Sequence, residues 1–266
     1  MRGLGILMAI LLAVGLAACG GQTASQPAPQ DAVVLAASKT NDAGTYKADM
    51  TGTVDAAGQS LEMTGTGEVD AKQQRGNMSM KMSGVGQDIQ IEMVYAFPII
   101  YMRFPPSLAT GLPAGKSWVK MDLDKLGQQA GIDFGQLMQS AQADPSQGLQ
   151  YLQGATDVQA VGDEDIRGVA TTHYKAFVDL NSLADKNPAL KPTIDQLVEQ
   201  TGLSRIPVEV WVDDQNFVRR MKETLDTAGA STEFTIDLYD FGTPVTVTEP
   251  PAKDVVDFAD LIGQQG

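Results

Sequence analysis

The chain is poor in the residues that carry most enzymatic and metal chemistry. Its 266 residues include one cysteine, Cys19, and one histidine, His173. A single cysteine excludes an internal disulfide, and the two residues together cannot supply the usual Cys and His ligands of a zinc site. A Ser–His–Asp apparatus would depend on His173 alone. We therefore expect no enzyme, no catalytic residues, no bound metal and no cofactor.

Positive charge is also scarce. The 19 Lys and Arg residues stand against 33 Asp and Glu residues, which gives a net charge of −14. Nucleic-acid binding usually needs a basic face, so we expect no nucleic-acid partner. An acidic domain is also repelled by an anionic lipid surface. Attachment to a membrane would therefore need an anchor and not a basic patch.

The first 18 residues have the pattern of an export signal. Arg2 supplies the positive start, and an apolar run over 4–16 follows that is shorter than the roughly 20 residues of a membrane-spanning helix. The run ends in Leu-Ala-Ala-Cys at 16–19, which resembles the bacterial lipobox, whose cysteine receives diacylglycerol. An ordinary signal peptide with an incidental cysteine is the alternative. Because Cys19 lies at the cleavage point, we predict a lipoprotein signal peptide over 1–18 and lipidation of Cys19.

A flexible tether is predicted to follow the lipidated cysteine, over 19–30. Residues 20–30 are rich in Gly, Ser, Gln and Pro and present no apolar face. At roughly 3.3 Å per residue, the tether would hold a domain up to about 35 Å from the membrane. No break in composition divides residues 31–266, so we expect a single domain there. The expected location is exported and lipid-anchored, at the outer face of the cytoplasmic membrane.

Alternating apolar and polar residues predict antiparallel strands in the first half of that domain. Residues 45–54, 60–69, 75–83 and 87–95 each alternate with a period of two. Each strand would therefore have one apolar and one polar face. Residues 97–104 and 117–123 are expected to extend the same sheet.

The remainder mixes helices with strands. Helical spacing over 124–153 is interrupted by glycines and by Asp144-Pro145, which predicts short helices. Together these patterns predict an α+β fold with one large antiparallel sheet of about ten strands, which must coil and whose inner apolar face the helices must cover. Further helices are expected over 31–38 and 187–201, and a short helix or strand end over 254–262. Further strands are expected over 158–180, 207–212, 217–225 and 231–241. The stretch 158–180 should contain a hairpin turn, either at 162–165 or at 167–168.

Methionine is unusually frequent on the predicted apolar faces. The chain has 12 methionines, and the first four strands carry several of them beside Gly52, Gly65, Gly67 and Gly76. Methionine is flexible and suits surfaces that accept variable apolar shapes, whereas glycine leaves space. An ordinary filled core is the alternative. We predict an apolar ligand-binding cavity lined by Met50, Met63, Met78, Met80, Ile89, Ile91 and Met93.

Three other patterns favour ordinary structural roles. Residues 111–117 are similar to a phosphate-binding loop, but a strand follows them where the motif needs a helix. The acidic runs at 163–165 and 213–214 lack the spacing of a calcium loop and are interpreted as turns. His173 alternates with the polar residues of its strand, so we expect it at the surface.

Four segments taken together resemble a known family. They are the lipobox at 16–19, GKSWVKMDL at 115–123, VGDEDIRGVATTHYKAFVDL at 161–180 and PVEVWVDDQNFVRRM at 207–221. The chain resembles the LppX/LprG-type lipoproteins of actinobacteria, which are similar in fold to the LolA and LolB lipoprotein carriers. The resemblance implies an unclosed β-barrel wrapped around helices, a hydrophobic cavity for acyl chains, no catalysis, and transport of lipids or lipoglycans in the cell envelope, where a transporter is a possible partner.

Three hypotheses about function follow. The first is a membrane-anchored lipid carrier whose sheet and 124–153 helices enclose acyl chains. The second is a structural or signalling lipoprotein with a filled core and a protein partner. The third is an exported hydrolase that uses His173, for which the sequence offers no matching nucleophile motif.

Overall fold

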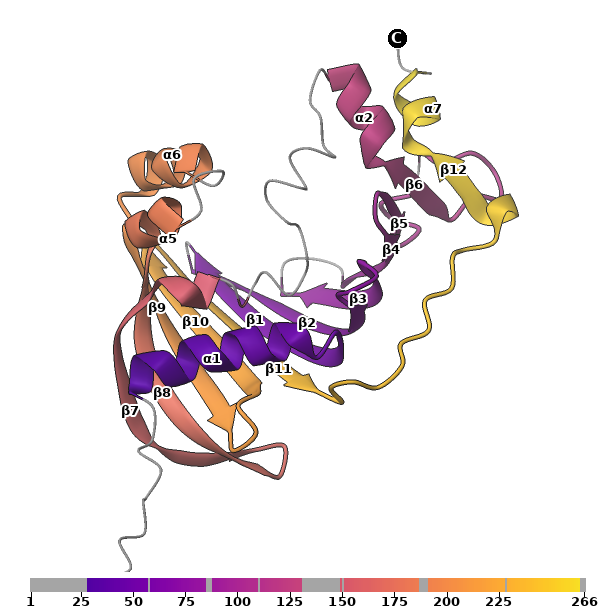
Figure 1. The fold of residues 1–266 in the computed structure, drawn as a ribbon. Helices are drawn as coiled ribbons and strands as arrows, with labels where there is room; N and C mark the ends of the chain where they lie inside the picture. Colours follow the sequence, from indigo (N-terminus) through magenta and orange to yellow (C-terminus); the bar gives the residue numbers. More distant parts are fainter. Residues whose placement is uncertain are drawn as a thin grey trace, which may run out of the picture.

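The computed structural model describes residues 28–56, 58–84, 88–109, 111–130, 149, 151–186, 191–227 and 229–263. Within these residues twelve strands form one sheet, which curves strongly and does not close (Figure 1). The strands are β1 Thr45–Ala56, β2 Gln59–Asp70, β3 Arg75–Ser83, β4 Ile89–Ala96, β5 Ile99–Arg103, β6 Trp118–Asp122, β7 Ala155–Ile166, β8 Val169–Asp179, β9 Arg205–Asp213, β10 Val218–Thr227, β11 Ala230–Tyr239 and β12 Val255–Asp257.

The order of the strands in space is β12-β6-β5-β4-β3-β2-β1-β11-β10-β9-β8-β7. Every pairing is antiparallel except that of β12 with β6, which is parallel. The first strand pairs with β11 near the middle of the sheet, so distant parts of the chain meet there. The predicted α+β fold with a large, coiled, unclosed antiparallel sheet is therefore confirmed.

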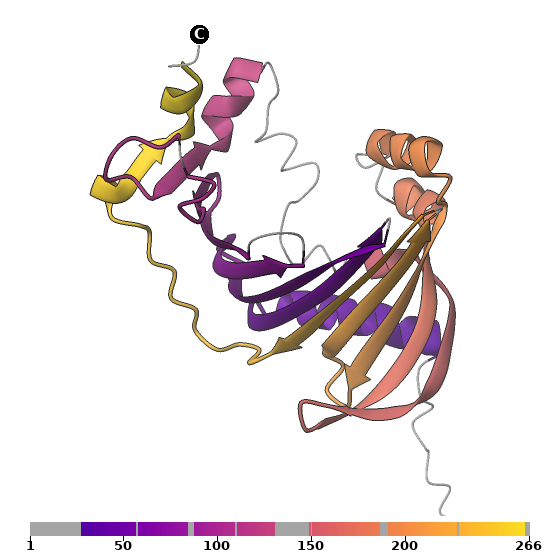
Figure 2. The same cartoon turned by 180° about the vertical axis from the view of Figure 1, so that it is seen from behind.

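The helices are short and lie at the margins of the sheet, apart from α1, which crosses it (Figure 2). None of the helices among the described residues is both long enough and apolar enough to cross a membrane. They are α1 Pro29–Asp42, α2 Leu123–Ala130, η1 Tyr151–Gly154, α5 Leu180–Lys186, α6 Lys191–Thr201, η3 Ala252–Asp254 and α7 Phe258–Gly263.

The helix α1 forms because its ends are favourable and one of its stripes is apolar. Pro29 begins the first turn, where its missing N–H costs nothing, and Asp31 and Lys39 complement the helix dipole at the two ends. Gly44 follows the helix with a φ of 82°, a backbone conformation that favours glycine. The buried residues of α1 recur at helical spacing and lie against the sheet: Ala32, Val33, Ala36, Ala37 and Thr40.

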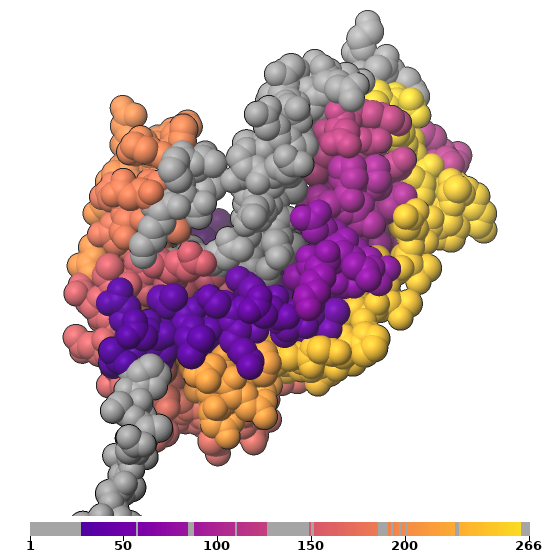
Figure 3. Space-filling model, viewed as in Figure 1, coloured from indigo at the N-terminus to yellow at the C-terminus, as the bar shows by residue number. Residues whose placement is uncertain are grey.

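We call the face of the sheet that α1 covers the inner face. It holds the main core. Val33 of α1, Leu152 of η1, Val178 of β8 and Val210 of β9 are all completely buried in it. Burial of such a side chain stabilises the fold by roughly 1.5–3 kcal/mol. In the space-filling view α1 lies across the lower part of the molecule, with α5 and α6 above it on one side and α2 on the other (Figure 3).

One buried polar group of this core is fully satisfied. The Thr40 hydroxyl donates to the Ala36 carbonyl oxygen at 2.8 Å and accepts from the Val218 backbone N–H at 2.9 Å. The second bond ties α1 to β10. Thr40 therefore fixes the position of α1 on the sheet without leaving an unpaired buried hydroxyl.

The hairpin of β7 and β8 folds against the outer face of the sheet. Its turn lies at Arg167 and Gly168, with φ values of 54° and 79°, the left-handed pair typical of a two-residue hairpin turn. Arg167 stacks over the Tyr239 ring at 3.9 Å and pairs with Asp49 at 2.6 Å. The tip of the hairpin is thus held on β11 and β1.

After β11 the chain runs in extended form from the middle of the sheet to the edge that β12 forms (Figure 2). There the Tyr101 hydroxyl donates to a Glu249 carboxylate oxygen at 3.0 Å. The Ser117 N–H donates to the Asp254 carbonyl oxygen, and Lys116 Nζ donates to the Lys253 carbonyl oxygen, both at 2.9 Å. These bonds hold the end of the chain on β5 and β6.

Several predicted elements change in extent. The predicted helix over 31–38 is longer and becomes α1. Of the two predicted positions for the turn inside 158–180, the one at 167–168 is confirmed, and the one at 162–165 is wrong because these residues belong to β7. The helix α5 was not predicted. Part of the predicted helices over 124–153, residues 131–148, lies outside the described residues, as do residues 1–27 and 187–190.

Candidate functional site

The candidate site is the inner face of strands β1–β4, here called the methionine face. Pairing in register places Met50, Gly65, Met80 and Ile91 directly opposite one another across these strands. Directly opposed residues point to the same side of an antiparallel sheet. By the same pairing, all seven residues predicted to line a cavity lie on this face: Met50, Met63, Met78, Met80, Ile89, Ile91 and Met93.

The methionine face is less deeply buried than the core under α1. Met50 is 9% exposed, whereas Met63, Met78, Met80 and Met93 are only half-buried. The valines Val208 and Val210 on the same face of β9 are 1% and 0% exposed. The apolar side chains of β2, β3 and β4 therefore retain contact area that a further apolar group could cover.

The glycines on this face do not leave the empty space that the sequence suggested. A Cβ atom at Gly65 would lie 3.1 Å from Met50 Cε and 3.1 Å from Met80 Cγ. At Gly52 it would lie 3.0 Å from Met63 Cε. Long methionine side chains from neighbouring strands lie across these glycines, because an unbranched thioether bends easily into an available gap. The expectation of open space at Gly52 and Gly65 is therefore wrong, and what lies there is a layer of movable side chains.

Gly76 has a different and more rigid neighbour. A Cβ atom there would lie 2.5 Å from the Tyr95 hydroxyl oxygen and 2.5 Å from the Glu68 carbonyl oxygen. Glycine at this position is required by the close approach of the Tyr95 ring to the backbone of β3. This end of the methionine face is closed by Tyr95, which is 4% exposed.

One charged residue interrupts the inner face, and the sequence analysis missed it. Glu223 of β10 is paired with Phe234 of β11 and with Val208 of β9, so it shares the inner face with both. Among the inner-face positions that the register assigns in β1–β4 and β9–β11, Glu223 is the only charged side chain. The alternation of Met221, Glu223 and Leu225 was the available signal.

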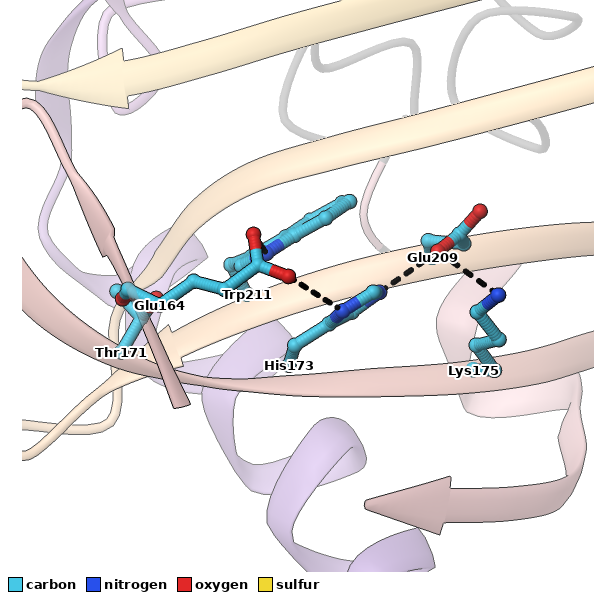
Figure 4. Close-up of polar contacts among 6 residues, drawn as sticks. All are labelled: Glu164, Thr171, His173, Lys175, Glu209 and Trp211. Carbon is cyan, nitrogen blue, oxygen red and sulfur yellow. Dashed lines mark hydrogen bonds and ion pairs between the residues drawn. The ribbon is translucent and has the colours of Figure 1, made fainter. Parts of the chain in front are cut away.

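The outer face carries a compact polar cluster around the single histidine (Figure 4). Nδ1 and Nε2 of His173 lie 3.2 and 2.7 Å from carboxylate oxygens of Glu164 and Glu209. The imidazole stacks on the Trp211 ring at 4.1 Å, and the indole N–H donates to Glu164 at 3.0 Å. Lys175 Nζ lies 3.6 Å from the Glu209 carboxylate.

His173 lies on the polar face, as expected, but it is not a surface residue. It is 7% exposed, because Trp211 stacks on it and Glu164 of the folded hairpin covers it. Both ring nitrogens already face carboxylates, and the nearby Thr171 hydroxyl donates to the Glu164 backbone carbonyl oxygen at 2.6 Å. The cluster therefore fastens the hairpin to β8 and β9.

The acidic pair at 213–214 organises the turn between β9 and β10. Asp213 Oδ1 accepts from the backbone N–H groups of Gln215 and Phe217, and Oδ2 accepts from Arg219 Nε at 2.6 Å. The prediction of a turn here is confirmed. Among the described residues, no group of three or more His, Cys, Asp or Glu side chains is arranged to hold a metal ion.

Two sequence relatives come from Streptomyces. An uncharacterised 31.2 kDa protein of Streptomyces griseus, from the rplA–rplJ intergenic region, is 30% identical over 198 residues, which is 72% of this chain and 64% of that protein. A protein of Streptomyces coelicolor named "Putative lipoprotein SCO4650" is 30% identical over 155 residues, which is 57% of this chain and 46% of that protein. The chain thus spans less than two thirds of the length of either relative. No protein-family model matches it.

Two proteins from mycobacteria are among the solved structures that are similar to the chain. LprF of Mycobacterium bovis has 15% sequence identity and a TM-score of 0.49, and the match covers 84% of this chain and 97% of LprF. The lipoprotein LppX of Mycobacterium tuberculosis has 17% identity and a TM-score of 0.47, and the match covers 84% of this chain and 100% of LppX. The sequence predicts a resemblance to LppX-type actinobacterial lipoproteins, and LprF and LppX are among the solved structures that are similar to the chain.

Proposed function

We propose that the protein is an exported lipoprotein that binds lipid acyl chains on its methionine face and carries lipids or lipoglycans in the cell envelope. The observation that carries the proposal is the in-register row of half-buried methionine and isoleucine side chains on β1–β4, next to a core that is fully closed. The resemblance to LppX-type lipoproteins supports the same function. An envelope transporter is the expected partner in loading or release.

The chemistry of the methionine face suits reversible binding of acyl chains. Burial of apolar surface contributes roughly 25 cal/mol per Å², or about 0.8 kcal/mol for each methylene group. Methionine side chains such as Met50 and Met80 can change rotamer to expose the backbone at Gly65 and so adapt to chains of different length. No covalent step is needed, because transfer requires only binding that is favourable and reversible.

The proposal includes a lipid anchor at Cys19 on the outer face of the cytoplasmic membrane. Residues 1–18 would be removed as a signal peptide, residues 19–30 would form the tether, and one lipid-binding domain would occupy 31–266. Pro29 already begins α1, so the folded part starts within the last residues of that tether. Two or three acyl chains on one cysteine give stable attachment, whereas a single chain gives only marginal binding.

The anchor is tested by replacing its cysteine. We expect Cys19→Ala to leave the uncleaved precursor and to abolish incorporation of labelled fatty acid, as measured by the mass of the purified protein and by metabolic labelling. Labelling that continues in Cys19→Ala would contradict the anchor and leave the lipid-binding domain to be judged separately.

Lipid binding is tested by filling the methionine face. The 20–266 fragment is purified, and its co-purified lipid is identified by mass spectrometry. We expect Met80→Trp to lower the amount of bound lipid several-fold while the melting temperature stays within a few degrees. Ser79→Trp is the matched control, because it adds the same ring to the outer face of the same strand and should leave lipid binding unchanged.

A structural or signalling lipoprotein with a filled core is the alternative function. The methionine ends that lie across Gly52 and Gly65 favour it, since they already occupy part of the space. In that case Met80→Trp would overpack the interior, at a cost of about 1–3 kcal/mol, and would melt early. An early-melting variant, together with a wild-type fragment that carries no lipid, would replace the carrier with this alternative.

A further inference from the structure

Methionine sulfur is concentrated on the methionine face and is scarce in the core under α1. The face carries six methionines: Met50, Met63, Met78, Met80, Met82 and Met93. Among the described residues, the buried core cluster consists of valine, alanine, leucine and tyrosine side chains, with Met221 as its single methionine. The two regions therefore differ in what they offer to a reagent that attacks sulfur.

The methionines of the face are also accessible to small molecules. Of the methionines that the structure describes, only Met50 and Met221 are buried, at 9% and 6% exposed. The other five methionines of the face are half-buried: Met63, Met78, Met80, Met82 and Met93. A small oxidant can reach these five side chains in the folded protein, whereas Met221 becomes accessible only when the core opens.

The thioether groups of this face react with peroxides and hypohalous acids to give sulfoxides, and hydrocarbon side chains do not. The sulfur attacks one oxygen atom of hydrogen peroxide, an S–O bond forms, and the O–O bond breaks. The sulfur is oxidised by two electrons, and the peroxide is reduced to water. The sulfoxide is polar, so a face that carries several of them no longer offers an apolar surface to acyl chains.

The residues that hold the fold together lie outside the reach of this reaction. Val33 of α1, Val178 of β8 and Val210 of β9 are completely buried and contain no sulfur. The sulfoxides, in contrast, would form on side chains that already meet solvent, so no new polar group has to be buried in the core. Loss of ligand binding is therefore separable from loss of folding.

We propose that the methionine face is a site of reversible oxidative modification, at which peroxides convert the five half-buried methionines to sulfoxides and so abolish lipid binding. This inference rests on the proposed lipid-binding function and adds the control of its site. Methionine sulfoxide reductases, with one enzyme for each sulfoxide epimer, reverse the modification. A bound acyl chain covers the sulfur atoms, so the empty face is oxidised faster than the loaded one.

The test reads oxidation and lipid binding in the same spectrum. The full chain, in detergent micelles, is treated with hydrogen peroxide, freed of the reagent and offered dioleoylglycerol. Native mass spectrometry then records both the added oxygen atoms and the bound lipid, and peptide mapping assigns the oxidised residues.

We expect oxidation to lower the bound dioleoylglycerol about fivefold or more, with a melting temperature that stays within a few degrees. The five face methionines should be oxidised about tenfold faster than Met221, because Met221 is protected by the core. Treatment with both sulfoxide reductases should restore the methionines and the bound lipid.

Two variants separate the face from other accessible sulfur atoms. Replacement of all five half-buried face methionines by leucine keeps their size and apolar character, so this variant should bind dioleoylglycerol equally before and after peroxide treatment. Met121→Leu is the matched control, because Met121 of β6 is also half-buried but lies outside the methionine face. Oxidised Met121→Leu should lose lipid as the wild-type chain does.

The outcomes distinguish this inference from lipid binding itself. Retained lipid on a chain whose five face methionines are oxidised would overturn the inference and leave lipid binding standing, as would reductase treatment that restores the methionines without the lipid. Oxidation of Met221 at the same rate as the face would show that the core has opened and would overturn the selective modification. If the untreated chain retains no dioleoylglycerol, lipid binding fails. The reductase experiment uses the wild-type chain, so it decides even where the leucine variant does not fold.

Discussion

The two halves of the sheet use the same inner face in different ways. Where α1 and η1 cover β8–β10, the inner positions hold the branched side chains of Val178, Val208, Val210 and Val218, which are 0–1% exposed. In β2–β4 the corresponding positions include methionine and isoleucine side chains that stay half-buried: Met63, Met78, Met80, Ile89, Ile91 and Met93. One half of the sheet is therefore a closed core, and the other is an adaptable surface.

The difference follows from the side chains themselves. Valine is branched at Cβ, which restricts its χ1 angle, so it packs in few arrangements and fixes the sheet against α1. Methionine has three rotatable side-chain bonds and specifies packing weakly. Stability is thus concentrated in the half that contacts α1, and side chains that can change rotamer are concentrated in the other.

The largest effect on stability is expected from a substitution in the closed half of the sheet. Leu152 of η1 is completely buried between α1 and the sheet. Leu152→Ala should lower the free energy of unfolding by about 2–5 kcal/mol, because the fixed valines around it cannot close the cavity. Met93→Ala on the methionine face should cost less than half as much, since Met93 is already partly exposed. Urea denaturation of the two variants measures the difference, and equal losses would show that the two halves are packed alike.

A smaller effect is expected at the hydrogen bond between Tyr101 of β5 and Glu249, which holds the segment after β11 against the methionine-rich half of the sheet. Burial and the bond to Glu249 raise the pKa of Tyr101 to about 12. The folded-state pKa lies above the unfolded value of about 10, so the contribution of Tyr101 to stability is complete below pH 10 and is lost as the pH rises from about 10 to about 12.

Tyr101→Phe should therefore lower the free energy of unfolding by about 1 kcal/mol near neutral pH, through the lost hydrogen bond, and should flatten the decline above pH 10. Unfolding in urea at a series of pH values measures both effects. Ultraviolet titration should show that the variant lacks a tyrosine that ionises near pH 12. An unchanged alkaline decline in Tyr101→Phe would assign that decline to other groups.

The smallest effect on stability is expected from a substitution on the outer face of β3, in the methionine-rich half of the sheet. Lys81 pairs with Asp88 at 2.7 Å, and both side chains are more than half exposed. Exposed pairs contribute little, so Lys81→Ala should change the melting temperature by no more than a degree or two and leave lipid retention as in the wild type. A marked loss of bound lipid in Lys81→Ala would mean that the outer face also takes part in binding.

The sequence predicted the strands of the sheet well, because alternation with a period of two reports directly which face is buried. The inner-face positions of β1–β4, and with them all seven predicted lining residues, follow from that pattern. The pattern does not report what covers a residue from another part of the chain. The burial of His173 depends on Glu164 and Trp211, which only the fold brings to it.

The same limit applies to the space above the glycines. A missing side chain at Gly65 is visible in the sequence, but the methionine ends that fill the gap come from Met50 and Met80 on the adjacent strands. Glu223 was overlooked for the opposite reason. The alternation of β10 already placed Glu223 on the apolar face. In an acidic chain, however, one more acidic residue is unusual only when its four apolar neighbours are known, and two of these come from other strands.

The pairing of β1 with β11 has a consequence for the order in which the chain can fold. Thr45–Ala56 finds its partner only when Ala230–Tyr239 has been synthesised, and this pairing joins the two halves of the sheet. Contacts between such distant segments carry a large loop-closure cost and make folding slow. Until Ala230–Tyr239 has been synthesised, the methionine strands and the valine strands are separate hairpin arrays, so the two halves of the sheet can join only after the strands of both have been made.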